Sequence, residues 1–260
     1  MSRVGTRDMA KVSRKMSHFA LLTLGRTKGE TWAMSAAAAL LDRLGRPGDV
    51  RLGTAHPEPI PRLPTGLAAL DETLGGGLPR GQVTELAGPP GTGRTALACA
   101  IAAHATRAGE IIAWIDPEDA LDPATAATAG MVLERTLWVR PRSVADAHRA
   151  AAIVLGAGGF GLVVVDLTPG VRRMAPAARP RPRALAHAAE RSRTPLVVLA
   201  PSAGSGSDAA LVLAVRARRV CWSGGAGRLV LLDGIDACVT VARSRVGRPG
   251  RTLVVRHACA

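Results

Sequence analysis

Residues 88–95 read Gly-Pro-Pro-Gly-Thr-Gly-Arg-Thr, and this stretch decides the fold expected for the 260-residue chain. It matches the phosphate-loop pattern G-x-x-x-x-G-K-[ST] except at Arg94, which stands where the pattern has lysine. The glycines let the backbone bend so that successive N–H groups face an anion. Apolar residues 82–87 favour a buried strand and residues 96–106 favour a helix, so the loop has the flanks that the motif needs. The stretch therefore predicts an α/β fold.

The loop and two later segments supply the residues expected to hold ATP and Mg²⁺. Thr95 opens the helix, whose N-terminus favours an anion, and its hydroxyl is placed to ligate Mg²⁺. Residues 161–167 are an apolar strand carrying Asp166, the pattern of a Walker B aspartate that anchors Mg²⁺. Glu118 follows the strand at residues 111–116, where a general base for an attacking water would stand. The loop's own set is Gly88, Gly91, Thr92, Gly93, Arg94 and Thr95.

Arg94 keeps the positive charge of the usual lysine but changes its shape. Lysine acts there as a compact point charge between the β- and γ-phosphates, whereas arginine is a longer, planar fork. We therefore expect ATP and Mg²⁺ binding to be weakened, and hydrolysis to be weak or absent.

Several segments together resemble the bacterial RecA family. Residues 63–71 (Leu-Pro-Thr-Gly-Leu-Ala-Ala-Leu-Asp), residues 74–81 (Leu-Gly-Gly-Gly-Leu-Pro-Arg-Gly), the loop and residues 114–123 (Trp-Ile-Asp-Pro-Glu-Asp-Ala-Leu-Asp-Pro) follow in order. The resemblance runs from about residue 63 onward and is strongest up to residue 123. It implies a RecA-like P-loop fold, with a mostly parallel twisted central sheet and helices on both faces. It also implies that Glu118 matches the family's catalytic carboxylate and Asp122 its adenine contact.

Three positions depart from the family pattern. The adenine-stacking tyrosine falls at Thr125, and the chain contains no tyrosine. The glutamine that couples ATP to DNA binding should end the strand near residue 200, but Pro201 follows there. With Arg94, these changes all affect the path from nucleotide to DNA, which favours a RecA paralogue over a working recombinase.

The chain is expected to divide near residue 60. Residues 1–60 form a basic extension with a helix at residues 31–44 and a linker, and the helix packs either on an adjacent subunit or on its own domain. Residues 61–260 form the RecA-like core, without the family's separate C-terminal domain. Near its end, residues 211–220 are a candidate strand, residues 228–232 and 238–243 alternate toward a hairpin-like edge, and residues 252–256 close as a strand.

The formal net charge is +14, and it is unevenly distributed. Residues 1–63 carry +6, residues 64–166 carry −4, and residues 167–260 carry +12. A basic excess confined to the flanks, beside a mildly acidic nucleotide half, points to a polyanionic partner.

Residues 171–193 are the most basic stretch and are expected to form an arginine-rich loop. In the RecA family, the segment after the Walker B strand holds the first DNA-binding loop. Residues 202–208, at the place of the second, have no basic or aromatic side chain, and aromatic residues make up only 2% of the chain. DNA contact should therefore be electrostatic, salt-sensitive and not sequence-specific. The candidate DNA-binding residues are Arg172, Arg173, Arg179, Arg181, Arg183, Arg243 and Arg245.

Arg243 and Arg245 leave three interpretations open. They contact DNA, they reach the nucleotide of a neighbouring subunit as basic residues near this place do in RecA filaments, or they protect an edge strand against aggregation.

Cysteine usage and hydropathy bear on the compartment. The four cysteines are widely spaced, without a metal-ligand pattern, and are typical of reduced thiols in a cytosolic protein. No apolar run approaches the ~18 residues of a membrane span. We expect a cytoplasmic, nucleoid-associated protein with no membrane partner.

Within the RecA-like proteins, the chain most resembles the ImuA (SulA-like) group of bacterial mutagenesis cassettes in size, charge and pattern of losses. That resemblance implies a DNA-binding accessory protein of damage-induced, error-prone translesion synthesis in the SOS response. Its expected partners are an ImuB-type Y-family-like protein, an error-prone polymerase and RecA itself. The alternative is a DNA-dependent ATPase or recombinase of the RecA family, in which Arg94 substitutes adequately and Glu118 is active.

Overall fold

The computed structural model describes residues 60–168, 182–204, 208–224, 230–245 and 249–258. The expected N-terminal extension and its helix lie outside these residues, so the domain boundary stays a prediction. The elements are β1 (Arg62–Leu63), α3 (Ala68–Leu74), β2 (Leu78–Pro79), β3 (Val83–Ala87), α4 (Arg94–Arg107), β4 (Ile112–Ile115), α5 (Pro123–Thr128), η1 (Leu133–Arg135), β5 (Thr136–Val139), α6 (Val144–Ala157), β6 (Leu162–Asp166), α7 (Pro182–Ser192), β7 (Leu196–Ala200), β8 (Leu211–Ser223), β9 (Leu231–Ser244) and β10 (Thr252–Ala258).

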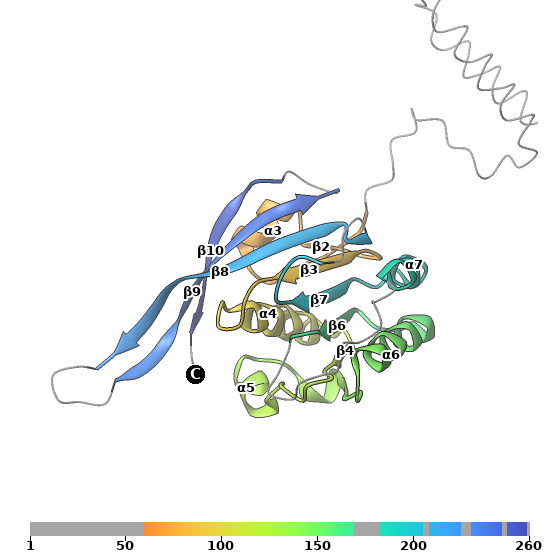
Figure 1. Cartoon of the computed structure of the whole chain (residues 1–260), viewed down its shortest axis with the longest axis horizontal. Coiled ribbons are helices and arrows are strands. Elements are labelled where there is room, and N and C mark those ends of the chain that lie inside the picture. The colour runs from red at the N-terminus through yellow and green to blue at the C-terminus, as the bar shows by residue number, and fades with distance from the viewer. Residues whose placement is uncertain (1–59, 169–181, 205–207, 225–229, 246–248, 259–260) are drawn as a thin grey trace, which may run out of the picture. The chain divides into compact units, whose positions relative to one another are not determined.

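Eight of the described strands form one mixed sheet in the order β10-β9-β8-β3-β7-β6-β4-β5. The neighbours from β8 to β5 are all parallel, whereas β9 runs antiparallel to both β8 and β10 (Figure 1). The strand that precedes the phosphate loop, β3, therefore lies between β8 and β7 inside the sheet. The predicted α/β fold with a mostly parallel central sheet is confirmed.

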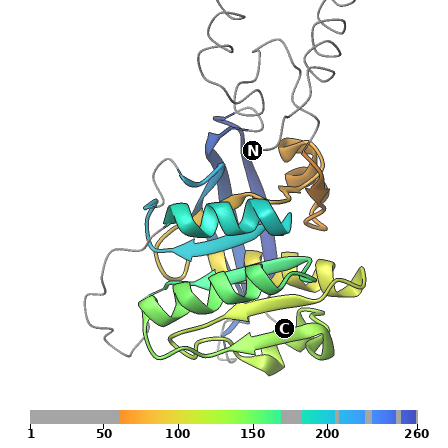
Figure 2. The ribbon, with the colours of Figure 1, turned by 90° about the vertical axis from the view of Figure 1, so that its right-hand side faces the viewer.

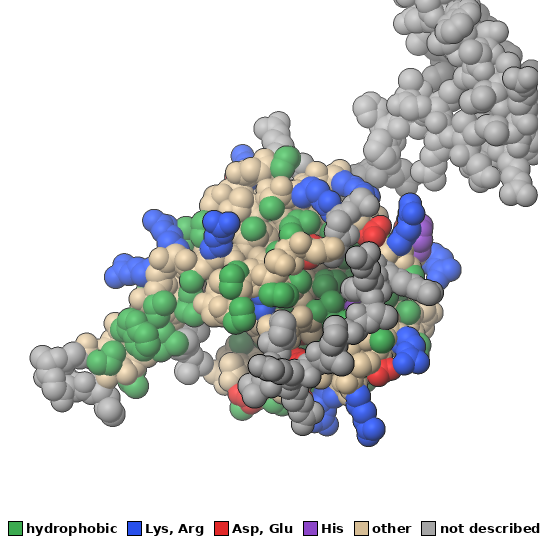
Figure 3. All heavy atoms as spheres, in the orientation of Figure 1, with side chains coloured by type: hydrophobic (Ala, Val, Ile, Leu, Met, Phe, Trp, Pro, Cys, Tyr) green, Lys and Arg blue, Asp and Glu red, His purple; other side chains and the backbone are tan. Residues whose placement is uncertain are grey.

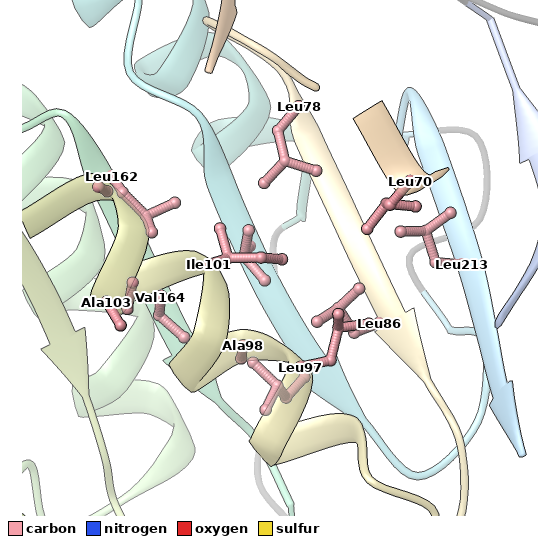
Figure 4. Close-up of a cluster of buried hydrophobic side chains, with 14 of the residues drawn as sticks. Leu70, Leu78, Leu86, Leu97, Ala98, Ile101, Ala103, Leu162, Val164 and Leu213 are labelled. Carbon is pink, nitrogen blue, oxygen red and sulfur yellow. The ribbon is translucent and has the colours of Figure 1, made fainter. Parts of the chain in front are cut away.

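Side chains of the central strands alternate between two hydrophobic cores, one on each face of the sheet. In β6, Leu162 and Val164 join the core under α4, while Val163 and Val165 join the core under α6 and α7. In the first core, Leu97 and Ile101 of α4 pack with Leu86 of β3 (Figure 4). The helices accordingly lie on both faces of the sheet (Figure 2). Strands buried on both faces read as continuous apolar runs, which is why the sequence located them.

The edge of the sheet differs from the prediction of two short strands at residues 228–232 and 238–243. The structure has a single fourteen-residue strand, β9, that pairs along its length with β8. Register shifts, as at β-bulges, interrupt the pairing at three places, between Val212 and Leu213, between Ala217 and Arg219, and between Cys221 and Trp222. Because a bulge breaks the period-two alternation without ending the pairing, the sequence pattern divided one strand into two.

The arginine-rich segment at residues 171–193 was predicted to be a loop, and this is wrong for its second part. Helix α7 occupies Pro182–Ser192, and its Leu185, Ala188 and Ala189 are buried. Proline is compatible with the first turn of a helix because that N–H needs no intrahelical partner. Among the helices in the part of the chain that the structure describes, none is both long and apolar enough to cross a membrane.

Gly88 joins β3 to the phosphate loop at a point where no side chain fits. A Cβ atom built on it would lie 2.3 Å from the carbonyl oxygen of Val215 in β8, which is backbone and cannot rotate away. The close approach of β8 therefore requires glycine at the first position of the loop.

Replacing Gly88 with alanine should lower the free energy of unfolding by about 1–3 kcal/mol, because the added methyl group overpacks the junction between β3 and β8. Gly156 is the matched control, since it lies on the exposed side of α6 and a Cβ there meets nothing within 4 Å. Gly156→Ala should raise stability by about 0.5–1 kcal/mol, since alanine favours the helix. Urea unfolding of both variants measures the two signs, and equal effects would contradict the argument.

Candidate nucleotide site

The residues predicted to hold a nucleotide meet at the carboxyl edge of the sheet. The phosphate loop follows β3, Asp166 is the last residue of β6, and Glu118 lies three residues beyond β4. In open α/β sheets, ligands bind outside the carboxyl ends of the strands, where neighbouring loops diverge. The fold thus places the loop, the Walker B candidate and the acidic segment at the same edge of the sheet.

The loop has a backbone suited to an anion. Gly91 and Gly93 have φ values of 77° and 86°, in the left-handed region where glycine is favoured. Thr92 donates its hydroxyl to the carbonyl of Pro89 at 2.8 Å, which tightens the turn. Helix α4 begins at Arg94, and no side chain caps its N-terminus. The N–H groups of its first turn therefore lack intrahelical partners and can bind phosphate oxygens, with Thr95 half-buried beside them.

Arg94 turns inward from the start of this helix and is only 3% exposed. Its Nη1 donates to the carbonyl oxygens of Gly88 and, at 2.8 Å, of Ala200. Its Nη2 donates to the hydroxyl of Thr168 at 2.6 Å. The guanidinium thus joins the ends of β3, β7 and β6 rather than lying free within the loop. Burial lowers the pKa of Arg94, and the nearby Asp166 opposes that shift.

Asp166 is bonded into the same arrangement through Thr168. Its Oδ1 accepts the backbone N–H of Thr168 at 2.9 Å and also the Thr168 hydroxyl. Burial raises the pKa of Asp166, whereas the two Thr168 bonds and the charge of Arg94 lower it, and Asp116 adds a further rise. One oxygen of the Walker B candidate is therefore already engaged by the protein.

Three carboxylate oxygens beside this arrangement are buried without a hydrogen-bond partner among the described residues. They are both oxygens of Glu118 and Oδ1 of Asp116. The other oxygen of Asp116 accepts the N–H of Leu121 at 2.8 Å and Trp138 Nε1 at 3.4 Å. Buried polar atoms are normally satisfied, so unpaired ones call for a water, a cation or a reacting group. Hard cations such as Mg²⁺ take oxygen ligands of this kind.

The described residues fit some parts of a bound Mg²⁺–nucleotide and not others. The amides of the loop and α4 suit the phosphates of a nucleotide, and Glu118 with Asp116 suits a bound water or Mg²⁺. The positive side chain that a phosphate loop normally directs at the terminal phosphate is not available, because the guanidinium of Arg94 is bonded to carbonyl oxygens of its own chain. The residues match a phosphate-binding site better than they match a hydrolytic one.

Asp122 and Thr125 have a structural role at the start of α5. Asp122 is exposed and caps the helix by accepting the N–H groups of Ala124 and Thr125 at 3.3 and 3.0 Å, as well as the Thr125 hydroxyl. These bonds, led by that from Thr125, lower the pKa of Asp122. A contact of Asp122 with adenine stays a prediction.

The candidate DNA-binding residues lie on different elements. Arg183 is exposed in the first turn of α7. Arg243 is half-buried near the end of β9 and donates to the carbonyl of Ala209 at 2.7 Å, so part of its function is to hold the start of β8. Arg245 is exposed immediately after β9. Arg172, Arg173, Arg179 and Arg181 lie outside the described residues.

Three residues near the loop were not among those that the sequence predicted for the site. Asp116 ends an apolar strand as Asp166 does, and that signal was available. Glu85 is buried inside β3 and accepts the N–H of Gly204 at 2.7 Å, which ties down the segment expected to hold the second DNA loop. His257 of β10 lies against Gly93, and burial lowers its pKa. No pattern in the sequence indicated the last two contacts, because each joins distant segments.

Replacing Arg94 with alanine should lower the free energy of unfolding by about 2–3 kcal/mol, because it removes bonds between a buried charge and three strand ends. Arg94→Lys should lower the free energy of unfolding by less, since lysine keeps the charge beside Asp166 but cannot make the same set of hydrogen bonds. Urea unfolding at neutral pH should give the highest stability for wild type, a lower one for Arg94→Lys and the lowest for Arg94→Ala. An alanine variant as stable as wild type would show that the guanidinium does not hold this edge.

The chain was compared with known families, sequences and structures. Residues 33–178 match the RecA N-terminal domain family. RecA from Paenarthrobacter aurescens is 42% identical over 136 residues, which are 52% of this chain and 39% of that protein. RecA from Mycobacteroides abscessus is 40% identical, again over 136 residues, 52% of this chain and 39% of that protein.

The chain thus spans about two fifths of the length of the curated relatives that it matches. Among solved structures, the RadB recombinase superposes with a TM-score of 0.58 at 21% identity, covering 75% of this chain and 95% of that one, which supports the fold. Since the family match spans more than half of its residues, the chain belongs to the RecA family.

Proposed function

We propose that this RecA-family chain is a DNA-binding accessory protein of the ImuA (SulA-like) kind, acting in damage-induced, error-prone translesion synthesis. It works in the cytoplasm, on the nucleoid, through contacts with DNA and proteins rather than through strong ATP hydrolysis. The proposed protein partners are an ImuB-type Y-family-like protein, an error-prone polymerase and RecA itself.

The observation that carries the proposal is the inward position of Arg94. Phosphoryl transfer needs a positive charge at the γ-phosphate as negative charge develops there. To supply it, Arg94 would have to leave the carbonyl oxygens of Gly88 and Ala200 and the hydroxyl of Thr168. This movement of Arg94 would also take its positive charge away from the buried Asp166. Hydrolysis by this site is therefore opposed by the same bonds that hold its strands together.

Nucleotide binding without turnover is compatible with this arrangement. The amides of the loop and of the first turn of α4 would hold the phosphates, and Thr95 with Asp166 would hold Mg²⁺. When bound, ATP would supply polyphosphate charge that orders the loop. Such binding can act as a structural signal even where the terminal phosphate is not transferred.

A second candidate, the DNA-dependent ATPase or recombinase, is favoured by Glu118. Both of its carboxylate oxygens are buried and have no partner among the described residues. A carboxylate held in this way can accept a proton from an attacking water. The two candidates differ in whether this residue affects turnover.

ATP turnover separates them. We expect turnover near background with or without single-stranded DNA, unchanged in Glu118→Gln, because the charge at the γ-phosphate is missing. Asp119→Asn is the matched control, since Asp119 is an exposed acid of the same segment that pairs only loosely with Arg140 at 3.4 Å. Turnover stimulated many-fold by DNA, lost in Glu118→Gln and kept in Asp119→Asn, would establish the ATPase instead.

DNA binding should depend on salt and not on sequence. Replacing Arg179, Arg181 and Arg183 with alanine should reduce the slope of log K against log salt by roughly 2 to 3, at ~0.9 per phosphate contact on duplex DNA. Alanine at Arg140, Arg142 and Arg149, exposed in the acidic nucleotide half, is the control and should leave the slope unchanged. Fluorescence anisotropy across a salt series measures the slope for both variants. If the slope of the variant at residues 179–183 equals that of wild type, these arginines do not contact DNA.

A further inference from the structure

The far part of β8 and β9 forms an arm, defined here as residues 216–223 of β8 and residues 231–238 of β9, which pair with them. Strand β10 pairs with the other edge of β9 only as far as Gly234. Strand β8 pairs with β3 only from Leu211 to Ala214, while its pairing with β9 continues to Ser223. Past Ala214, no described strand pairs with the edge of β8 that faced β3. The arm therefore leaves the body of the sheet with that edge of its backbone open (Figure 1).

One face of the arm is apolar and exposed. The register places Trp222 opposite Leu232 and Val220 opposite Ile235, and residues directly opposite each other share a face. On this face Val220, Trp222 and Leu232 are 42%, 60% and 38% exposed, and Leu231, opposite Ser223 on the other face, is 61% exposed. Figure 3 shows hydrophobic side chains gathered along the arm. Only the tip of the arm, where Trp222 pairs with Leu232, lies beyond the described pairing of β10, and a two-stranded ribbon is at best marginally stable by itself. Exposed apolar patches of this kind mark interaction sites.

The arm also carries a positive charge excess beside that face. Arg216, Arg218 and Arg219 are exposed on β8. The opposite strand has only two acids to set against them. Asp233 accepts the Ser223 hydroxyl at 2.6 Å, and Asp236, opposite Arg219, accepts Arg256 Nε at 2.7 Å. The pKa of Asp236 is lowered chiefly by Arg256 and also by Arg219 and Arg218, so one carboxylate is shared among three guanidinium groups. The arginines therefore favour an acidic partner.

Edge protection explains only part of this arrangement. Charged residues and a bulge, as at Arg218, are common devices that keep an open edge from aggregating. A protected edge has no need of exposed Trp222, Val220 and Leu232. Nucleic acid is also a poor match, because bases stack on aromatic rings and three of the four exposed apolar side chains are aliphatic.

We propose that the arm binds an extended, acidic segment of a partner protein, which adds as a strand to the open edge of β8. The segment's apolar side chains would pack on Val220, Trp222 and Leu232, and its carboxylates would face Arg216, Arg218 and Arg219. Backbone bonds supply affinity in this mode of recognition, and the alternating side chains supply specificity. The inference goes beyond the proposed function, since it holds whether or not the chain binds DNA.

The test uses the full chain as bait for a displayed library of random 12-residue peptides. We expect the selected peptides to alternate acidic and apolar residues and to bind at least tenfold more weakly to Trp222→Ser. Their binding should also be at least tenfold weaker to a variant in which Arg216, Arg218 and Arg219 are all changed to glutamate. Ile153→Ser is the matched control, since Ile153 of α6 is 72% exposed and lies far from the arm in sequence, and it should leave binding unchanged.

Proline substitution in a selected peptide tests the added strand, because proline removes a backbone donor. Proline at alternate positions of the peptide should give affinities that differ by at least tenfold. A peptide held only by its side chains would show no such alternation in affinity. If Trp222→Ser fails to fold, the arginine variant and the proline series still decide the proposal.

Three results would overturn it. The first is a selection without acidic peptides, or one whose peptides bind Trp222→Ser as tightly as wild type. The second is that wild type binds short DNA but no peptide, and that the arm variants lose this binding, which would make the arm a nucleic-acid surface. The third is a wild-type dimer, seen by size-exclusion chromatography, that dissociates in Trp222→Ser, which would assign the arm to a second copy of the chain.

Discussion

The buried guanidinium of Arg94 is the interaction on which the candidate site depends. It is bonded to the residue that follows β3, to the last residue of β7 and, through Thr168, to the last residue of β6. A buried charge is costly unless it is paired and hydrogen-bonded, and Asp166 with the two carbonyl oxygens provides both conditions. The loop, the Walker B candidate and the end of the sheet are thereby held as one unit.

That arrangement separates two properties that usually occur together in a phosphate loop. Anion binding depends on backbone amides at the start of α4, and these do not require the side chain at position 94. Hydrolysis depends on a cation directed outward at the terminal phosphate, and the arginine of this chain is directed inward. Binding of a phosphate and its transfer therefore depend on different groups of this site, and the accessory role proposed above rests on that difference.

The two halves of the sheet are stabilised differently. From β3 to β4 the strands are buried on both faces beneath α4, α6 and α7, so side-chain packing holds them. In β8, Leu213 and Val215 are still fully buried, but residues 216–220 are all exposed. The change occurs where Val215 touches Gly88, so the exposed arm begins directly beside the phosphate loop. A partner on the arm would therefore bind beside the contact between β8 and the phosphate loop.

The sequence by itself determined the fold class, the parallel core strands and the place of the phosphate loop, because these follow from local composition and spacing. Continuous apolar runs identified β3, β6 and β7, and three glycines identified the turn before α4. The sequence pattern was misleading where tertiary contacts overrode it. Pairing with β8 continues through the bulges of β9, and burial of Leu185 and Ala189 stabilises helix α7.

Only the tertiary structure decided the direction of Arg94, the partners of Asp166 and the exposure of Trp222. Arg94 meets acceptors 74 and 106 residues farther along the chain, and no local rule determines which side chains such distant segments bring together.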